Sequence, residues 1–287
     1  MTIALANAPV SYGAFELTVG IMPGVPDGDT VLDEVASAGY AGIDLGPLGY
    51  LGTGDQLRRN LERRSLGLAG GFFELPFSEP AEMDAAIAGL GGLLDAFDAI
   101  SSRDGLRPRP TLAALGSRSQ PFDDARWRRF ADGVERALEV CRKRGYEPTF
   151  HHETGTQIET PEEIERVLDL TSTGLCLDTG HLLLGGGDPV RAIDEWRPRI
   201  NHLHLKDARR SVVEQIVRES APVSEIWKRK AFCRLGAGDL DVDAMLNAIR
   251  DSYDGWIVVE QDVLPEPDGS AAEDQRANRR YLAERGF

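Results

Sequence analysis

The stretch INHLHLKD, residues 200–207, decides how the rest of the chain is interpreted. Its apolar residues Ile200, Leu203 and Leu205 follow the spacing of a strand, yet two histidines, a lysine and an aspartate stand among them. Burying a charge without a partner costs several kcal/mol, so this much polarity at a strand end needs a specific reason. We interpret the stretch as a strand that ends at a site of chemistry.

A short apolar run followed by an amphipathic helical run recurs on both sides of this stretch. The runs that read as strands are 3–12, 42–46, 68–75, 110–116, 147–153, 174–180, 200–207 and 255–261. Strands that alternate with helices are typical of βα units around a parallel sheet. Repeated over 287 residues, these units predict an α/β fold, a (β/α)8 TIM barrel that forms a single domain over residues 1–287.

Helix-start signals and one long connection refine this prediction. In TPEEIERVLDL, Thr160 can cap a helix, Pro161 suits its first turn, and Glu163 completes a capping box. After the seventh strand, the segment at about 208–240 delays the next helix, which we expect at 241–252. We interpret it as an insertion at the carboxyl end of the barrel, where active sites of this fold lie. A lid, a contact between copies of the chain and an ordinary basic surface helix all stay open for it.

Composition excludes several classes of partner. The formal charge of −15 and the isoelectric point of about 4.8 argue against nucleic acid, and hence against an apurinic endonuclease, because phosphate binding relies on clustered Lys and Arg. No apolar run approaches the length of a membrane span. The three cysteines are far apart without a CxxC pair, and we read Cys176 as a packed core thiol. These features predict a reduced, cytoplasmic protein without a membrane partner.

Acidic or imidazole side chains stand at the ends of four successive strands: Glu153, Asp178, His204 and Glu260. Each alone would more often be a cap or a loop contact, but consecutive barrel strands are neighbours, so the four should converge. Three carboxylates in one place repel unless a cation lies between them. Oxygen ligands with one imidazole favour Mn²⁺, with Co²⁺, Mg²⁺ or Fe²⁺ as alternatives, over a thiolate-bound structural Zn²⁺.

The same segments carry a family resemblance. The strings FHHETGTQIET, GLCLDTGHLLLGGGDP, INHLHLKDARRS, LGAGDLD and GWIVVEQD resemble the xylose isomerase-like TIM barrels, the sugar phosphate isomerases and epimerases, and among them most the inosose (2-keto-myo-inositol) dehydratases. The resemblance covers residues from about 147 to 262 and implies that Glu153, Asp178, His204 and Glu260 bind one divalent metal. The dehydratases tend to have His-Met-Gly-Thr where this chain has Glu153-Thr154-Gly155-Thr156. A Glu at that strand end is typical of the isomerases and epimerases.

The resemblance implies a metal-dependent lyase that dehydrates an inosose-like keto-polyol through an enediolate. The alternatives are a ketose epimerase or isomerase of the same superfamily and a non-catalytic barrel that binds a sugar or a partner. Glu153 and Glu260 are candidates for the base, and His181 and Lys206 for proton donors. Lys206 could instead form a supporting ion pair with Asp178 or Glu153.

Three further residues are predicted to contact a small-molecule keto-polyol or ketose: Glu74, His151 and Arg209. Glu74 ends the third strand, Arg209 leads into the insertion, and His151 shares a strand face with Glu153. A solvated loop acid is the alternative for Glu74. His151 and His202 could instead support the metal ligands from behind.

Overall fold

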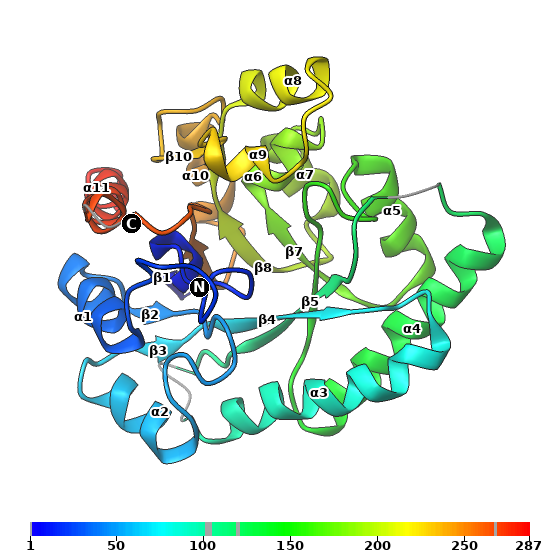
Figure 1. The fold of residues 1–287 in the computed structure, drawn as a ribbon, viewed down its shortest axis with the longest axis horizontal. Coiled ribbons are helices and arrows are strands. Elements are labelled where there is room, and N and C mark those ends of the chain that lie inside the picture. The colour runs from blue at the N-terminus through cyan, green and yellow to red at the C-terminus, as the bar shows by residue number, and fades with distance from the viewer. Residues whose placement is uncertain (1, 101–104, 119–120, 267–268) are drawn as a thin grey trace.

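Nine short strands form one parallel sheet in the computed structural model, which describes residues 2–100, 105–118, 121–266 and 269–287 (Figure 1). Their order in the sheet is β3-β2-β1-β11-β8-β7-β6-β5-β4. The bounds are β1 Ile3–Asn7, β2 Gly42–Ile43, β3 Gly67–Leu68, β4 Gly70–Leu75, β5 Arg109–Ala114, β6 Thr149–His151, β7 Gly174–Asp178, β8 Ile200–Leu205 and β11 Gly255–Val259.

The sheet closes on itself because its two ends belong to one strand. Only Ala69 separates β3, which pairs with β2, from β4, which pairs with β5. Counting β3 and β4 as one barrel strand leaves the eight strands of a TIM barrel, so the predicted fold is confirmed.

Helices cover the outside of the ring of strands (Figure 1). They are α1 Gly28–Ala38, α2 Gly54–Glu62, α3 Pro80–Asp98, α4 Asp124–Lys143, α5 Pro161–Leu170, α7 Pro189–Trp196, α10 Val242–Arg250 and α11 Ser270–Ala283. Among the described residues, no helix combines the length and the apolar character that crossing a bilayer requires.

Seven of the eight predicted strands run past the end of the real strand, and in two of them a change of backbone conformation ends the strand. The first strand stops at Asn7, and Pro9–Tyr12 forms a 3-10 turn, η1, with Pro at its start. The sixth strand stops at Asp178, and Thr179–Leu184 forms helix α6. The Asp178 side chain caps α6 by accepting from the His181 N–H at 2.9 Å. Residues expected to continue the strand therefore begin a helix.

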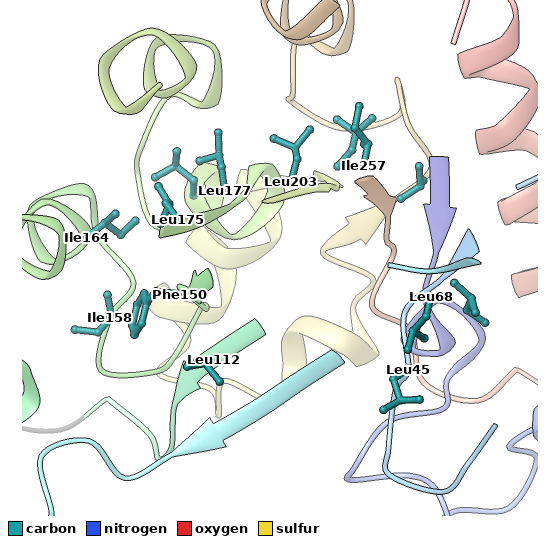
Figure 2. Packing of buried hydrophobic residues seen from close by; sticks show 14 of the residues in the cluster. Leu45, Leu68, Leu112, Phe150, Ile158, Ile164, Leu175, Leu177, Leu203 and Ile257 are labelled. Atoms are coloured by element: carbon teal, nitrogen blue, oxygen red, sulfur yellow. The ribbon is translucent and has the colours of Figure 1, made fainter. Parts of the chain in front are cut away.

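The main core lies between the strands and the helices. Leu175, Leu177, Leu203 and Ile257 are fully buried on this outer side of the sheet (Figure 2). Strand alternation turns their neighbours inward, which is how the polar side chains of β7 and β8 come to face the barrel interior. Near the amino end of β11, Gly42 leaves room for the Trp256 side chain. A Cβ atom at residue 42 would lie 2.7 Å from the Trp256 ring.

The capping box expected at the start of α5 is present. Thr160 Oγ1 accepts from the Glu163 N–H, and the Glu163 carboxylate accepts from the Thr160 N–H at 3.0 Å. Replacing Thr160 with alanine is expected to lower the free energy of unfolding by about 1 kcal/mol, measured by urea denaturation. Thr160→Ser keeps the acceptor oxygen and should show a smaller loss; an equal loss would mean that the cap contributes nothing.

The segment between β8 and α10 has structure of its own. It contains β9 Asp207–Ala208, α8 Arg210–Arg218, α9 Glu225–Lys228 and β10 Phe232–Cys233, and β9 pairs antiparallel with β10. The buried Asp207 carboxylate accepts four backbone N–H groups, from Ala208, Gly236, Gly238 and Leu240. Asp207 therefore fixes the turn that returns the chain to the barrel.

Replacing Asp207 with asparagine should destabilise this turn, because an amide NH₂ cannot accept from the backbone donors that one carboxylate oxygen now satisfies. Two of those donors, on Gly236 and Gly238, share Oδ2 at 2.9 and 3.0 Å. We expect a loss of about 2 kcal/mol in the free energy of unfolding, measured with urea. The exposed Asp239, in the same turn, provides the control: Asp239→Asn should cost clearly less, and equal losses would contradict the argument.

Candidate active site

A pocket opens at the carboxyl ends of the barrel strands and contains about 640 Å³ of space, its open mouth included. Its charged and imidazole lining comes from the ends of six barrel strands and the segments after them. These side chains are Glu16, Asp44, His151, Glu153, His181, His204, Lys206, Glu260 and Asp262. Phe15, Phe72 and Trp227 contribute aromatic walls. Such a pocket, apolar with a few convergent polar groups, suits a small organic molecule.

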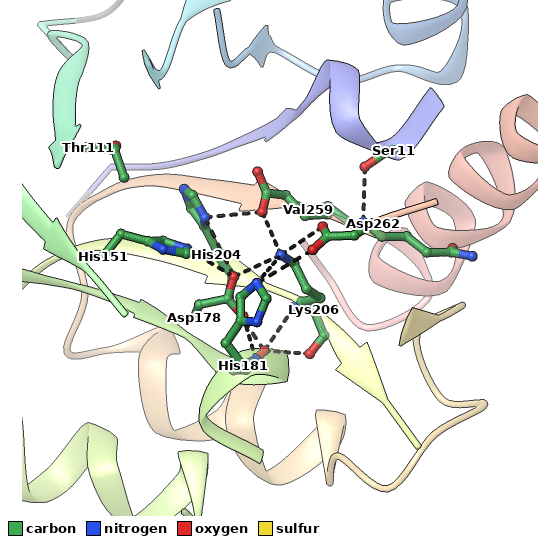
Figure 3. Close-up of polar contacts among 12 residues, drawn as sticks. Ser11, Thr111, His151, Asp178, His181, His204, Lys206, Val259 and Asp262 are labelled. Atoms are coloured by element: carbon green, nitrogen blue, oxygen red, sulfur yellow. Dashed lines mark hydrogen bonds and ion pairs between the residues drawn. The ribbon is translucent and has the colours of Figure 1, made fainter. Parts of the chain in front are cut away.

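The Lys206 ammonium lies at the centre of the polar cluster (Figure 3). Its Nζ atom lies 3.1 Å from Asp178 Oδ2, 3.1 Å from Glu260 Oε2 and 2.8 Å from Asp262 Oδ1. Its side chain is 2% exposed, so these ion pairs are almost entirely shielded from water. Lys206 thus binds three carboxylates from two strand ends, one of which, Asp178, is a partner expected from the sequence.

His204 lies beside the same carboxylates. Its Nδ1 atom is 3.1 Å from Glu260 Oε2 and 3.7 Å from Asp178 Oδ2, while Nε2 has no hydrogen-bond partner within the described residues. His151 approaches Asp178 from the other side, with Nε2 3.4 Å from Oδ2. Burial lowers the pKa of His151 to about 4, so its ring is neutral and its lone pair is available.

These contacts keep the cluster ionised. Burial favours neutral carboxyl groups, but the Lys206 charge holds the pKa of Asp178 well below its usual range. Burial likewise disfavours charge on Glu260, and the neighbouring His204 and Lys206 lower its pKa all the same. In return the carboxylates, Asp178 first among them, raise the pKa of Lys206 against the effect of burial.

Both ring nitrogens of His181 lie beside hydrogen-bond donors. The residue stands in the first turn of α6, and its Nδ1 atom accepts from the Thr154 backbone N–H at 3.2 Å. A backbone N–H can only donate, so this contact favours a ring proton on Nε2, whereas the Lys206 ammonium beside Nε2 can also only donate and favours the other tautomer. The Nε2 atom faces Asp262 Oδ2 at 3.5 Å and Lys206 Nζ at 3.2 Å. His181 therefore presents its Nε2 atom to the pocket, between the Asp262 carboxylate and the Lys206 ammonium.

Glu153 lines the pocket but stands apart from the ion pairs. Three of the four predicted ligands, Asp178, His204 and Glu260, lie together, whereas no ion pair in the described part of the chain joins Glu153 to them. Burial raises the pKa of Glu153 to about 7. In this arrangement its carboxylate lies at the wall of the pocket near the cluster.

Two predicted substrate contacts lie outside the pocket lining. Glu74 is half-buried on β4, where burial raises its pKa. Arg209 precedes α8, and its guanidinium Nη1 donates to the Lys230 carbonyl at 3.1 Å. The third predicted contact, His151, does face the pocket.

Three acids in the pocket were not singled out from the sequence: Glu16, Asp44 and Asp262. Asp262 follows Glu260 by two residues and forms the shortest of the Lys206 ion pairs. Asp44 follows β2, and burial raises its pKa to about 7. The signal for Asp44 was present in GIDLG, where the acid directly follows the short strand β2, just as Glu260 directly follows β11.

The donor atoms suit a divalent cation. Among the described residues, three sets of buried side chains bring one ligand atom each to within 4.8 Å of one another. They are Asp44, His204 and Glu260; His151, Asp178 and His181; and His151, Cys176 and His204. Carboxylate oxygens with imidazole nitrogens, one of them the unpartnered His204 Nε2, are the ligands expected for Mn²⁺, Fe²⁺ or Co²⁺. The buried cluster is consistent with a divalent metal site.

Comparison with known proteins agrees with the fold and the motifs. An inosose dehydratase of Geobacillus kaustophilus (strain HTA426) is 30% identical to the chain over 273 residues, which are 90% of this chain and 87% of that protein. The inosose dehydratase of Lacticaseibacillus casei is 31% identical over 278 residues, 92% of this chain and 91% of that protein. A solved structure of the IOLI protein with a binding zinc atom superimposes with a TM-score of 0.75, at 12% identity, and covers 98% of this chain and 97% of that chain.

The family itself is defined by a sequence pattern described as xylose isomerase-like TIM barrel, which matches residues 32–284. The match spans most of the chain, including the first half, where the sequence offered only the alternation of strands and helices. The resemblance predicted from the strand-end motifs is confirmed, and the chain belongs to the xylose isomerase-like TIM barrel family.

Proposed function

We propose that the protein is a divalent-metal-dependent dehydratase that removes water from an inosose-like keto-polyol. The superfamily comprises metal-dependent sugar isomerases, epimerases and dehydratases, and the relatives similar over about 90% of the chain are inosose dehydratases. The observation that carries the proposal is the buried cluster of Asp178, His204, Glu260 and Lys206 at the pocket. The similarity of the chain to inosose dehydratases supports the choice of reaction.

The residues that would hold the metal are Asp178, His204 and Glu260, with Glu153 joining them from the pocket wall. A divalent ion there would supply Lewis-acid stabilisation of the negative charge that develops on a substrate oxygen. Dehydration also needs a base to remove the proton next to the carbonyl group and an acid to protonate the departing hydroxyl group. The chain has candidates for both around one pocket.

Glu153 and Glu260 are the candidate bases, because both carboxylates line the pocket. His181, through Nε2, and the Lys206 ammonium are the candidate donors to the leaving hydroxyl group. They lie 3.2 Å apart, so a proton given up by one can be replaced from the other. His151, on the pocket wall, is placed to bind a substrate hydroxyl group.

A second candidate, a ketose epimerase or isomerase, is favoured by one observation. Glu153 lines the pocket and stands apart from the ion pairs, so its carboxylate can exchange a proton with substrate. In that reaction the proton returns to the opposite face or to the neighbouring carbon, and no hydroxyl group leaves.

Proton exchange in D₂O, followed by NMR, separates these functions. The Mn²⁺-loaded and metal-stripped proteins are compared on a panel headed by 2-keto-myo-inositol and including ketoses. Metal-dependent loss of water supports the dehydratase, whereas exchange beside the carbonyl group without elimination supports the epimerase or isomerase. No exchange with any substrate and no stoichiometric metal would leave a non-catalytic sugar-binding barrel.

A further inference from the structure

Cys176 faces the interior of the barrel directly below the proposed active site. It stands on β7 two residues before Asp178, so both side chains point inward, and its register partners are His151 on β6 and His202 on β8. The Cys176 Sγ atom and one ring nitrogen each of His151 and His204 lie within 4.8 Å of one another. The three residues are 0%, 4% and 2% exposed.

The proposed dehydration leaves part of this group unused. Cys176 has no role in it, and within the described residues the His151 Nδ1 atom has no hydrogen-bond partner. Unsatisfied polar atoms this deeply buried are uncommon in folded proteins and call for a bound group that satisfies them. Among the described residues, neither Cys141 nor Cys233 belongs to such a set of donors.

We propose that Cys176, His151 and His204 form a second metal site, one that takes a soft divalent ion such as Zn²⁺ or Cd²⁺. One thiolate and two imidazoles are ligands that soft and borderline ions prefer, and that Mg²⁺ and Mn²⁺ do not. Zinc bonds of about 2.0–2.3 Å require the three atoms to draw together slightly, a movement within the reach of side-chain rotation. The thiol proton leaves to solvent as the sulfur–metal bond forms.

This second site competes with the active site, because both use His204. A soft ion bound below the pocket takes the His204 imidazole away from Asp178 and Glu260 and leaves their oxygen ligands without a nitrogen ligand. Both histidines line the pocket, so an ion can enter from its mouth. The consequence is inhibition by zinc or cadmium that weakens as the Mn²⁺ concentration rises, because the two ions compete for His204. The inference rests on side-chain geometry and holds whichever reaction the enzyme catalyses.

Titration of the metal-stripped full chain with Cd²⁺ tests the site, because a cadmium–thiolate bond produces ultraviolet charge-transfer absorbance. We expect the band to rise to one equivalent in the wild-type protein and in the control Cys233→Ser. It should be lost in Cys176→Ser. A band that persists in Cys176→Ser, or no band in the wild type, would overturn the proposal.

Affinity measurements give a second readout, and Cys176→Ala serves if the serine variant fails to fold. We expect removal of the thiol to weaken Zn²⁺ binding by about 10-fold or more and to change Mn²⁺ binding far less. Equal changes for both ions would show that the thiol has only a structural role. Because neither measurement uses a substrate, a failed dehydratase assay leaves this test intact.

Discussion

Replacing His204 with alanine is expected to lower metal-dependent turnover by about 10³-fold, since Lewis-acid stabilisation of several kcal/mol is lost and 1.36 kcal/mol corresponds to a tenfold change. His204 is the imidazole nearest to Glu260, at 3.1 Å, and it also belongs to a donor set with Asp44. Without His204, the carboxylates of the site repel one another and a metal ion there loses its nitrogen ligand. The measurement combines bound Mn²⁺, quantified by electron paramagnetic resonance, with the proton-exchange assay.

His202→Gln is the matched control for this variant. His202 lies on the same strand and the same inward face as His204, two residues earlier, but it does not line the pocket. We expect it to retain stoichiometric Mn²⁺ and most of the turnover. Wild-type metal content and turnover in His204→Ala would remove His204 from the proposed site, and equal losses in both variants would point to a general effect on folding.

Replacing Lys206 with methionine is expected to lower the free energy of unfolding of the metal-free protein by about 3–5 kcal/mol. The ammonium is 2% exposed and lies within 3.1 Å of oxygens from Asp178, Glu260 and Asp262. Methionine fills a similar volume but leaves these buried carboxylates without their cation. Urea denaturation with and without Mn²⁺ provides the measurement, and Mn²⁺ should restore part of the loss because it neutralises the same oxygens.

The exposed Lys143 provides the comparison for the Lys206 variant. It pairs with Glu139 at 2.7 Å, but its side chain is 71% exposed, so Lys143→Met should cost less than about 1 kcal/mol. If Lys206→Met costs no more than Lys143→Met, the buried ion pairs do not stabilise the fold. If Mn²⁺ stabilises wild type and variant equally, the ion and the ammonium do not act on the same carboxylates.

The sequence alone determined the features that depend on near neighbours along the chain. Strand and helix alternation, together with caps such as the Thr160–Glu163 box, predicted the barrel correctly, because hydrophobic period and capping are local properties. The ends of the apolar runs placed Asp178, His204 and Glu260 at strand ends, and parallel strands bring those ends to one edge of the barrel. The fold, and the edge of the barrel at which these three side chains meet, could be predicted at this level.

Tertiary structure decided which of these side chains touch. The Lys206 ion pair with Asp178 was one expected alternative, but its pairs with Glu260 and Asp262 depend on where β8 and the chain after β11 come together. The place of Asp44 opposite them depends on closure of the sheet, and the approach of Cys176 to His151 depends on the register of β6 and β7. Contacts of this kind follow from barrel closure and inter-strand register, which no local pattern specifies, since residues distant in sequence meet only when the whole ring is formed.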